Sequence, residues 1–317
     1  ADEDGLPRPA NADELEDLNR AYGKDFVLFL DDNFLVSRKR VYELIGEIKR
    51  RGLHERMRFS FQCRGDNADR QVLQDLYDAG FTSVFFGIET ASEPLMEIIQ
   101  KGETVRDCID AVLMAKDIGF HVSATFIFGL PTETHQDRLD AMQLARDLGL
   151  DQVRFNNATP YPGTALFDIA QEQDRLNVQG QYENFLSVST FIENPFDKIP
   201  FAYVPPEATE GRLRSDVLFS YLALYMNVRR VREIVLKPKQ GVGWFNAGEK
   251  LAEKLRKLPA LVALFTFLSI KFLQLFWDIA RNTDTVLRFA DVFSALSGKP
   301  LGKRQVPGVG GVEQSSS

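Results

Sequence analysis

The residues best placed to do chemistry are polar side chains that follow short apolar runs. The run 84–86 leads into Gly87, Ile88 and Glu89, so an apolar segment ends on a carboxylate. At the tip of a strand, such a carboxylate can accept hydrogen bonds from a ligand that meets it there. A salt bridge at the edge of the sheet would explain the same residue, and both interpretations are open at this point.

Two further apolar runs end on polar groups in the same way. Asp32 and Asn33 follow one run and could accept hydrogen bonds from an ammonium group, although such residues also favour turns before helices. Arg64 follows another run, and its guanidinium has the geometry to pair with a carboxylate. The alternative for Arg64 is an ion pair with Asp66 or Asp69.

Metal-ligating residue types are few and scattered. Cys63 and Cys108 are 45 positions apart and fall on a predicted strand and on the apolar stripe of a predicted helix, which is typical of core cysteines. The three histidines, His54, His121 and His135, have no metal-ligand spacing and are interpreted as structural or surface residues. Two cysteines also exclude a disulfide framework and favour a reducing compartment.

A repeating strand–helix pattern must position these residues. The apolar runs are nearly continuous, as in strands that are covered on both faces of a parallel sheet. Between them lie helices with a capping residue at the start and a glycine after the end. The predicted strands are 26–30, 57–63, 83–89, 121–129 and 152–156; the predicted caps are Ser37, Asp69 and Thr104; and helices are also expected at 12–22 and 135–148. Five such units predict a parallel α/β fold, and a complete or partial (β/α) barrel fits better than a doubly wound sheet, because no GxGxxG motif follows a strand.

The ends of these strands resemble those of radical S-adenosylmethionine enzymes, in the branch that carries a cobalamin-binding domain. The resemblance covers roughly residues 12–235 and rests on five segments in the same order: FLDDNFLVSRKRV, FSFQCRGD, VFFGIETASEPLMEIIQKG, ATFIFGLPTET and ATPYPGTALF. It implies a partial (β/α)6 TIM-like barrel, here without its first strand and followed by a helical extension.

The resemblance also implies cofactors and a reaction. Family members use a 4Fe–4S cluster to cleave S-adenosylmethionine reductively, which drives hydrogen abstraction or, in cobalamin-dependent members, methyl transfer. The family holds the cluster on a CxxxCxxC loop that this sequence lacks. We therefore expect the chain to begin downstream of that loop, to bind no cluster by itself and to be inactive alone, with cobalamin in a domain that precedes it.

By the same resemblance, the strand ends form the site for S-adenosylmethionine. Glu89 would bind the ribose hydroxyls, and Gly87 would let the ligand approach the backbone. Asp32 and Asn33 would contribute to the site for the methionyl amino group, and Arg64 would pair with the methionyl carboxylate.

A second segment would contact the adenine. Ile127 would cover one face of the ring, while backbone groups near Gly129 and Pro131 would meet its edge. A tight turn from strand to helix would also explain this glycine and proline.

Charge divides the chain unevenly. Residues 211–304 hold 17 Lys and Arg against 7 Asp and Glu, whereas the whole chain has a net charge of −7. The acidic body argues against nucleic acid as a partner, and the basic C-terminal part leaves an anionic surface open. Residues 258–277 are almost wholly apolar but contain Lys271. Packing on protein is the preferred interpretation of this segment, ahead of a membrane interface and of a membrane span.

These observations give a domain layout and a function. Residues 1–173 are predicted to form the barrel core, 174–245 the loops at its mouth and a helix at about 207–236, 246–297 a basic and apolar helical extension, and 298–317 a disordered tail. The predicted function is radical S-adenosylmethionine chemistry on a small, lipophilic substrate, in a cytoplasmic protein that contacts membranes through residues 249–288. The alternatives are a barrel that lost its cluster and serves as a scaffold, and an aldolase-like or phosphate-binding barrel, for which no strand end offers the required lysine or glycine-rich loop.

Overall fold

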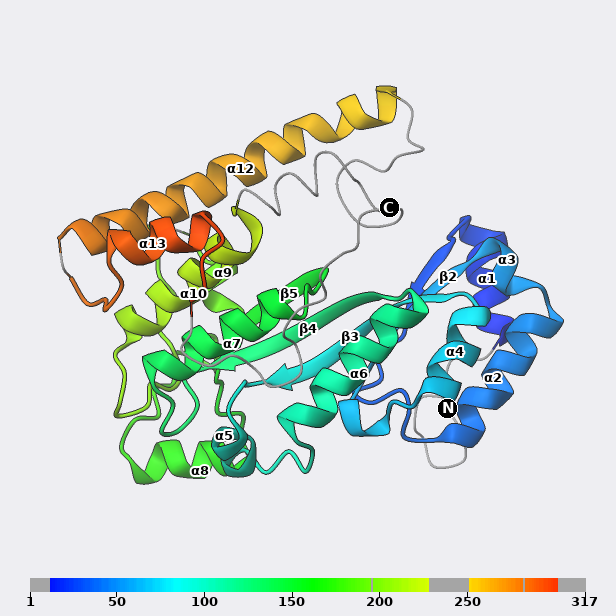
Figure 1. Cartoon of the computed structure of the whole chain (residues 1–317), viewed down its shortest axis with the longest axis horizontal. Helices are drawn as coiled ribbons and strands as arrows, with labels where there is room; N and C mark the ends of the chain where they lie inside the picture. Colours follow the sequence, from blue (N-terminus) through cyan, green and yellow to red (C-terminus); the bar gives the residue numbers. More distant parts are fainter. Residues whose placement is uncertain (1–11, 195, 228–250, 282, 302–317) are drawn as a thin grey trace. The chain divides into compact units, whose positions relative to one another are not determined.

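The computed structural model describes residues 12–194, 196–227, 251–281 and 283–301 (Figure 1). The chain divides into two compact units, each assembled from separate segments. The first unit comprises Ala1–Glu89, Gln100–Phe126 and Leu148–Arg154, and the second comprises Thr90–Ile99, Ile127–Asp147 and Phe155–Ser317.

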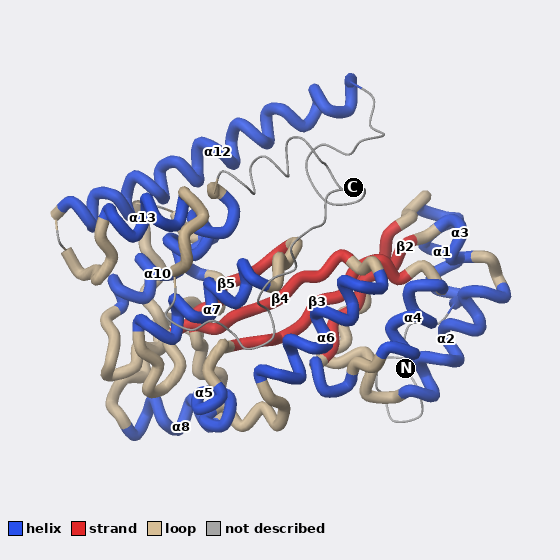
Figure 2. Tube along the Cα trace, in the orientation of Figure 1, coloured by secondary structure: helices blue, strands red, loops and turns tan. Residues whose placement is uncertain are grey.

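Five parallel strands form one sheet in sequence order, β1-β2-β3-β4-β5 (Figure 2). The strands are β1 (Phe26–Leu28), β2 (Arg58–Cys63), β3 (Phe81–Glu89), β4 (His121–Phe128) and β5 (Gln152–Asn157). Each strand overlaps a run that the sequence predicted. Neighbouring strands that are consecutive in sequence and joined through helices are the pattern of a partial (β/α) barrel, so the predicted fold class is confirmed.

The register aligns the carboxyl ends of β2 and β3. Cys63 pairs with Phe86, which places Arg64 beside Gly87 at the same edge of the sheet. On the other side of β3, the register with β4 shifts between Gly87 and Glu89. This irregularity is of the β-bulge kind, which re-aims a side chain at a strand end.

The edge strand β1 differs from the expectation that every strand is covered on both faces. Phe26 is 54% exposed and Leu28 is 49% exposed. In the described structure β1 pairs only with β2, because it stands at the end of the strand order. The apolar run at 26–30 therefore predicted the strand correctly but not its burial.

Helices of the first unit begin where the sequence placed their caps. Ser37, Asp69 and Thr104 accept hydrogen bonds from the amides of Arg40, Val72 and Asp107. The helices of this unit are α1 (Ala12–Tyr22), α2 (Arg38–Arg50), α3 (Leu53–Arg56), α4 (Arg70–Asp78) and α6 (Val105–Ile118), with a short 3-10 turn, η1 (Gly65–Asn67). Against the sheet, a cluster of phenylalanine rings fills the core, among them Phe29, Phe34, Phe59, Phe61 and Phe81.

The second unit is mainly helical. Its helices are α5 (Glu93–Ile98), α7 (His135–Asp147), α8 (Ala165–Glu172), α9 (Ser189–Ile192), α10 (Glu210–Tyr225), α12 (Leu251–Ala280) and α13 (Phe289–Leu296). α12 and α13 both lie against α10 (Figure 1). The helix predicted at about 207–236 is described as far as Tyr225, while 228–236 and most of the predicted tail, 302–317, lie outside the described residues.

The long helix α12 places its internal charge against protein. Lys271 is buried, its ammonium donates to the carbonyl of Thr190 at 2.9 Å, and Glu193 lies 3.6 Å away. This contact fits the preferred interpretation, in which the apolar segment packs on protein. Over the residues searched, none of the helices has both the length and the apolar character to cross a membrane.

Candidate functional site at the carboxyl end of strand β3

The end of β3 is built around an unusual backbone conformation. Glu89 has φ of 65°, in the left-handed region that residues other than glycine rarely occupy. The register shift between Gly87 and Glu89 lies at the same point. Strained backbone of this kind is concentrated at ligand sites, where the surrounding contacts hold it in place.

Lys101 holds the Glu89 side chain. Its ammonium lies 2.9 Å from Glu89 Oε1 and 3.0 Å from Glu103 Oε1, and it also donates to the carbonyl of Gly87. The ammonium thus donates hydrogen bonds to Gly87 and Glu89 and forms an ion pair with Glu103. Burial alone would lower the pKa of Lys101, but the two carboxylates outweigh it and raise the pKa above its usual value.

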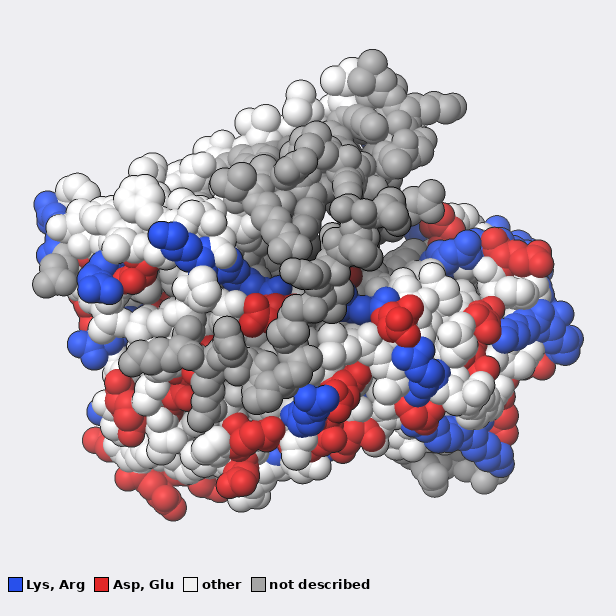
Figure 3. Space-filling view, in the orientation of Figure 1, with Lys and Arg blue, Asp and Glu red and all other residues white. Residues whose placement is uncertain are grey.

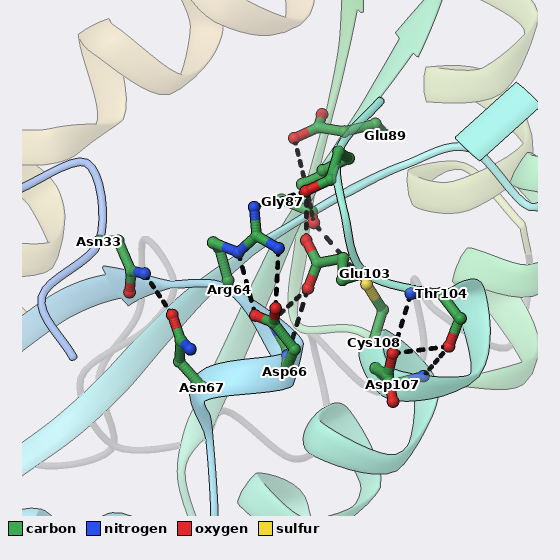
Figure 4. Close-up of polar contacts among 12 residues, drawn as sticks. Asn33, Arg64, Asp66, Asn67, Gly87, Glu89, Glu103, Thr104, Asp107 and Cys108 are labelled. Carbon is green, nitrogen blue, oxygen red and sulfur yellow. Dashed lines mark hydrogen bonds and ion pairs between the residues drawn. The ribbon is translucent and has the colours of Figure 1, made fainter. Parts of the chain in front are cut away.

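Gly87 is required by this ion pair rather than by an approaching ligand alone. A methyl group on Gly87 would overlap Glu89 Oε1 and would lie 2.9 Å from Lys101 Nζ. Figure 4 shows the Glu89 carboxylate and the Gly87 backbone at the same strand end. The absence of a side chain at Gly87 therefore leaves the space in which Glu89 and Lys101 meet.

Glu103 is the buried member of the group. Its side chain is fully buried, and its Oε2 accepts hydrogen bonds from the amides of Gly65 at 2.8 Å and Asp66 at 3.2 Å (Figure 4). We name Glu89, Lys101 and Glu103 the β3 cluster. Two carboxylates and one ammonium give it a net charge of −1, which favours a ligand that donates hydrogen bonds or carries positive charge.

Arg64 forms an ion pair with Asp66, which was one of the alternatives to ligand binding. Its guanidinium forms a bidentate pair with Asp66, at 3.0 and 2.7 Å, and donates to the carbonyl of Lys101 at 2.6 Å. Asp69 instead pairs with Arg38 at 2.9 Å. Arg64 is thus fixed beside the β3 cluster, and its pairing with a ligand carboxylate stays a prediction.

The loop after β1 gives a mixed result. Asp32 is exposed, whereas the Asn33 amide donates to the side chain of Asn67, in the turn that follows β2 (Figure 4). Asp31 pairs with Arg40 of α2 at 2.6 Å. Asp32 is therefore the residue of this loop that is open to a cationic ligand, and its role stays a prediction.

The predicted adenine segment lies in the second unit and is described by itself. Ile127 packs with Leu95, Leu130 and Ala158 in an apolar cluster. Gly129 has φ of 88°, and its amide donates to Glu133 Oε2 at 2.6 Å. The Gly129 amide is thus already bonded inside the protein. Pro131 follows at the start of the turn. The contact of this segment with adenine stays a prediction.

A second group of charges follows β4, and we name its members, Glu133, Arg138 and Asp216, the β4 cluster. Arg138 lies 3.1 Å from Glu133 Oε2 and 2.6 Å from Asp216 Oδ2, and His135 Nδ1 also lies 2.9 Å from Asp216. All three members are almost fully buried, and the cluster joins α7 to α10. Burial raises the pKa of Glu133 to about 7, because Arg138 shares its charge with Asp216 and does not offset the lost hydration.

The described residues do not fit an iron–sulfur cluster. Among them, no three His, Cys, Asp or Glu side chains come together as a metal site. Cys63 and Cys108 are free and buried on β2 and α6, as expected for core cysteines, and burial raises the pKa of both thiols. A thiol with a raised pKa is a poor source of the thiolate that a cluster needs.

The sequence alone missed five of the six residues that form these two clusters, since only Glu89 was singled out. Lys101 and Glu103 lie in a loop, where no periodicity indicates burial, and their only signal is a charged pair around Gly102 just before the Thr104 cap. Arg138 is a charge among the apolar buried residues of α7, and Asp216 is a buried charge on α10. Such a charge on a buried face signals an ion pair, but it does not identify the partner.

Known proteins resemble this chain in sequence and in fold. Residues 3–145 match the family model of the Radical SAM superfamily. This part of the chain belongs to the radical SAM superfamily. The β3 cluster lies within the matched residues, and so do all the predicted site residues.

Two curated relatives extend the comparison. An uncharacterized methyltransferase of Pyrococcus horikoshii is 37% identical over 158 residues, which are 50% of this chain and 34% of that protein. An anaerobic magnesium-protoporphyrin IX monomethyl ester cyclase of Cereibacter sphaeroides is 24% identical over 216 residues, covering 68% of this chain and 33% of that protein. The chain thus spans about a third of the length of these two relatives.

A solved structure shows the same fold. The radical SAM methyltransferase TsrM from Kitasatospora setae, with cobalamin and a [4Fe-4S] cluster bound, aligns with a TM-score of 0.51 and 20% identity. The alignment covers 67% of this chain and 45% of that one. The likeness shows a shared radical SAM barrel fold.

Proposed function

We propose that this chain is the barrel part of a radical SAM enzyme and that Glu89 binds the ribose of S-adenosylmethionine. The observation that carries the proposal is the end of β3, where a register shift and a left-handed backbone present the Glu89 carboxylate. A carboxylate there can accept hydrogen bonds from two neighbouring hydroxyls at once.

The charge of the β3 cluster supports the same ligand. Its net charge of −1 suits a molecule that carries an ammonium and a sulfonium. Lys101 donates to Glu89 Oε1, and none of the described residues donates a hydrogen bond to Oε2, so one oxygen is available without breaking the ion pair. Asp32 adds a second exposed acceptor on the loop after β1, and Arg64 adds a fixed cation for the ligand carboxylate.

When bound, S-adenosylmethionine supplies either a methyl group or the source of a radical that abstracts hydrogen. The residues of this chain would hold and orient it, and we assign them no part in ligating an iron–sulfur cluster. Methyl transfer with cobalamin is our finer proposal. It is supported by the methyltransferase relative and by the cobalamin bound to TsrM, whose fold this chain shares. A lipophilic substrate is part of the same proposal, and the cyclase that acts on a porphyrin ester is an example among the relatives.

A scaffold barrel without catalysis is the second candidate, because the described residues offer no cluster ligands. The family match and the relatives with enzymatic names favour an enzyme. The left-handed backbone at Glu89 also favours an enzyme, since strained backbone is concentrated at ligand sites.

Calorimetric titration of S-adenosylmethionine into the intact, cluster-loaded protein tests the proposal. Glu89→Gln keeps the shape of the side chain but removes its charge. Hydrogen bonds to a charged partner contribute about 1.5–3 kcal/mol each, so we expect binding to weaken roughly tenfold or more.

Glu55→Gln is the matched control, because Glu55 is an exposed residue of α3, which precedes β2 and therefore stands at the opposite end of the strand. We expect this variant to bind as the wild type does. Thermal melts of both variants complete the test. Unchanged affinity together with a lowered melting temperature for Glu89→Gln would mean that Glu89 only supports the strand end.

A further inference from the structure

The outward side of α12 is an apolar stripe. Its large residues recur every three or four positions, apart from one interval that holds Thr266 and Ser269, and they are between 48% and 65% exposed. Thr266 donates its hydroxyl to the carbonyl of Val262 at 2.8 Å, which satisfies that donor within the helix. We name this stripe the outer face of α12; its large apolar members are Leu255, Leu258, Val262, Leu273 and Trp277.

The opposite side of α12 is buried and carries Lys271. Lys271 lies on this side with Phe272, Leu275 and Ile279, all of them buried. Because Lys271 is bound by Thr190 and Glu193, the apolar segment keeps its one internal cation away from the outer face. Among the described side chains of α12, the outer face therefore holds apolar groups and two hydroxyl groups, but no charge.

The helix α13 extends the apolar surface. Phe289 stacks on Phe276 of α12 with ring centroids 6.4 Å apart, and Phe293, one turn further along α13, is 69% exposed. In Figure 3 the described surface along α12, at the upper edge of the view, is almost wholly white. Contiguous exposed apolar surface of this kind marks a site of contact, unlike scattered single residues.

Arginines stand at both ends of the outer face, and at the second end Asp278 precedes the arginine. Arg256 is exposed near its start, and Arg281 is exposed just after its end, with its guanidinium 4.1 Å from the centre of the Trp277 ring. The sequence adds Lys250, Lys254 and Lys257 at the first end. An arginine beside a tryptophan at the edge of an apolar stripe is typical of helices that lie in a membrane interface.

We propose that the outer face of α12, with Phe293 of α13, docks on the surface of an anionic membrane. Charge complementarity selects this occupant. Residues 211–304, which include both helices, hold 17 Lys and Arg against 7 Asp and Glu, so a second copy would bring the same excess of positive charge against itself. An anionic lipid surface complements this excess while the apolar stripe enters the acyl boundary, and each nearby cation strengthens the attraction.

Trp277 reports on this contact directly. In the full chain with Trp244→Phe, Trp277 is the remaining tryptophan, and its emission is recorded with vesicles of phosphatidylcholine alone or mixed with phosphatidylglycerol. We expect a blue shift with the mixed vesicles and quenching by brominated lipid. Raising the salt from about 0.1 M to 1 M shortens the screening length from about 10 Å to 3 Å and should weaken binding several-fold.

Leu273→Glu in the same background should reduce vesicle binding tenfold or more, because it places a carboxylate in the stripe. Leu30→Glu is the matched control, since Leu30 is 79% exposed elsewhere and should leave binding unchanged. If Leu273→Glu alters the circular dichroism melt, Leu258→Glu provides the same test at the other end. No blue shift with anionic vesicles, equal binding to neutral vesicles, or a blue shift that rises with protein concentration without lipid would each overturn the proposal, the last in favour of self-association.

Discussion

The β3 cluster and the β4 cluster use the same ingredients for opposite purposes. Each places one cation between two carboxyl groups in the segment that follows a strand. In the β4 cluster the cation is Arg138 and every side chain is at most 2% exposed, whereas in the β3 cluster Lys101 is 15% exposed and Glu89 is 18% exposed. Arg138 also joins two helices, while Lys101 joins a loop to the end of one strand.

The difference shows which cluster can change its partners. A guanidinium binds two carboxyl groups in a fixed fork, and the burial of the β4 cluster leaves no water to replace it. An ammonium is a compact charge on a flexible stem, and Glu89 is partly open to solvent. We therefore expect that the β3 cluster can exchange a contact for a ligand and that the β4 cluster stabilises the fold.

The largest expected effect separates the clusters by stability. Arg138→Met leaves Asp216 buried without its cation and should lower the free energy of unfolding by about 3–5 kcal/mol. Lys101→Met should cost only about 1–2 kcal/mol, because Glu103 keeps two amide donors and Glu89 can turn to water. Denaturant unfolding of both variants measures the two values.

Arg106→Gln is the control, since Arg106 forms an exposed pair with Asp110 on α6 and should change stability by less than about 1 kcal/mol. Equal losses for Arg138→Met and Lys101→Met would abolish the distinction between a holding cluster and an exchangeable one.

The β4 cluster should also make stability depend on pH. The folded-state pKa of Glu133, at about 7, is above the ordinary value of 4.5, so the folded protein binds the proton more tightly than the unfolded chain. This contribution is fully present below about pH 4.5 and is lost as pH rises through 7. The loss is up to roughly 3 kcal/mol.

Glu133→Gln should remove this part of the pH dependence, which unfolding measured between pH 4.5 and 8 would detect. If the free energy of unfolding has the same pH dependence in the wild type and in Glu133→Gln, Glu133 stays ionised beside Arg138 and the prediction is wrong.

The smallest effect on stability should come from Gly87→Ala. Its φ is not in the left-handed region, and the atoms that the new methyl group meets are the mobile ends of Glu89 and Lys101. We expect stability to change by less than about 1 kcal/mol, while S-adenosylmethionine binding weakens because the ion pair is displaced.

Calorimetric titration of the double variant Gly87→Ala with Glu89→Gln sharpens this test. If Gly87 acts by making room for Glu89, the second change should add little to the first. Full additivity of the two losses would instead mean that Gly87 acts on the ligand by itself.

The sequence predicted what depends on local pattern. Continuous apolar runs identified the five strands, and Ser37, Asp69 and Thr104 identified three helix starts, because a cap acts within its own turn. The position of Glu89 at a strand end followed from the same runs. Its left-handed backbone did not, because a bulge depends on the register with β4.

What could not be predicted depends on contacts between distant residues. The amides of Gly65 and Asp66 meet Glu103 across 38 and 37 positions, and Arg138 meets Asp216 across 78. The shorter helices α5, α8 and α13 were also not singled out, since eight or fewer residues carry little periodicity. The prediction that β1 is covered on both faces was wrong, because an edge strand and a central strand can have the same apolar pattern.

The contact of Lys271 with Thr190 and Glu193 bears on how the chain is made. The apolar stretch around Lys271 leaves the ribosome some 80 residues after its two acceptors, which can already be in place on α9 and at the residue that follows it. The ammonium of Lys271 can then bind the carbonyl of Thr190 and the carboxylate of Glu193 as soon as α12 is made. The order of synthesis thus favours docking of the helix on its own protein, and it leaves the outer face as the part that meets other molecules later.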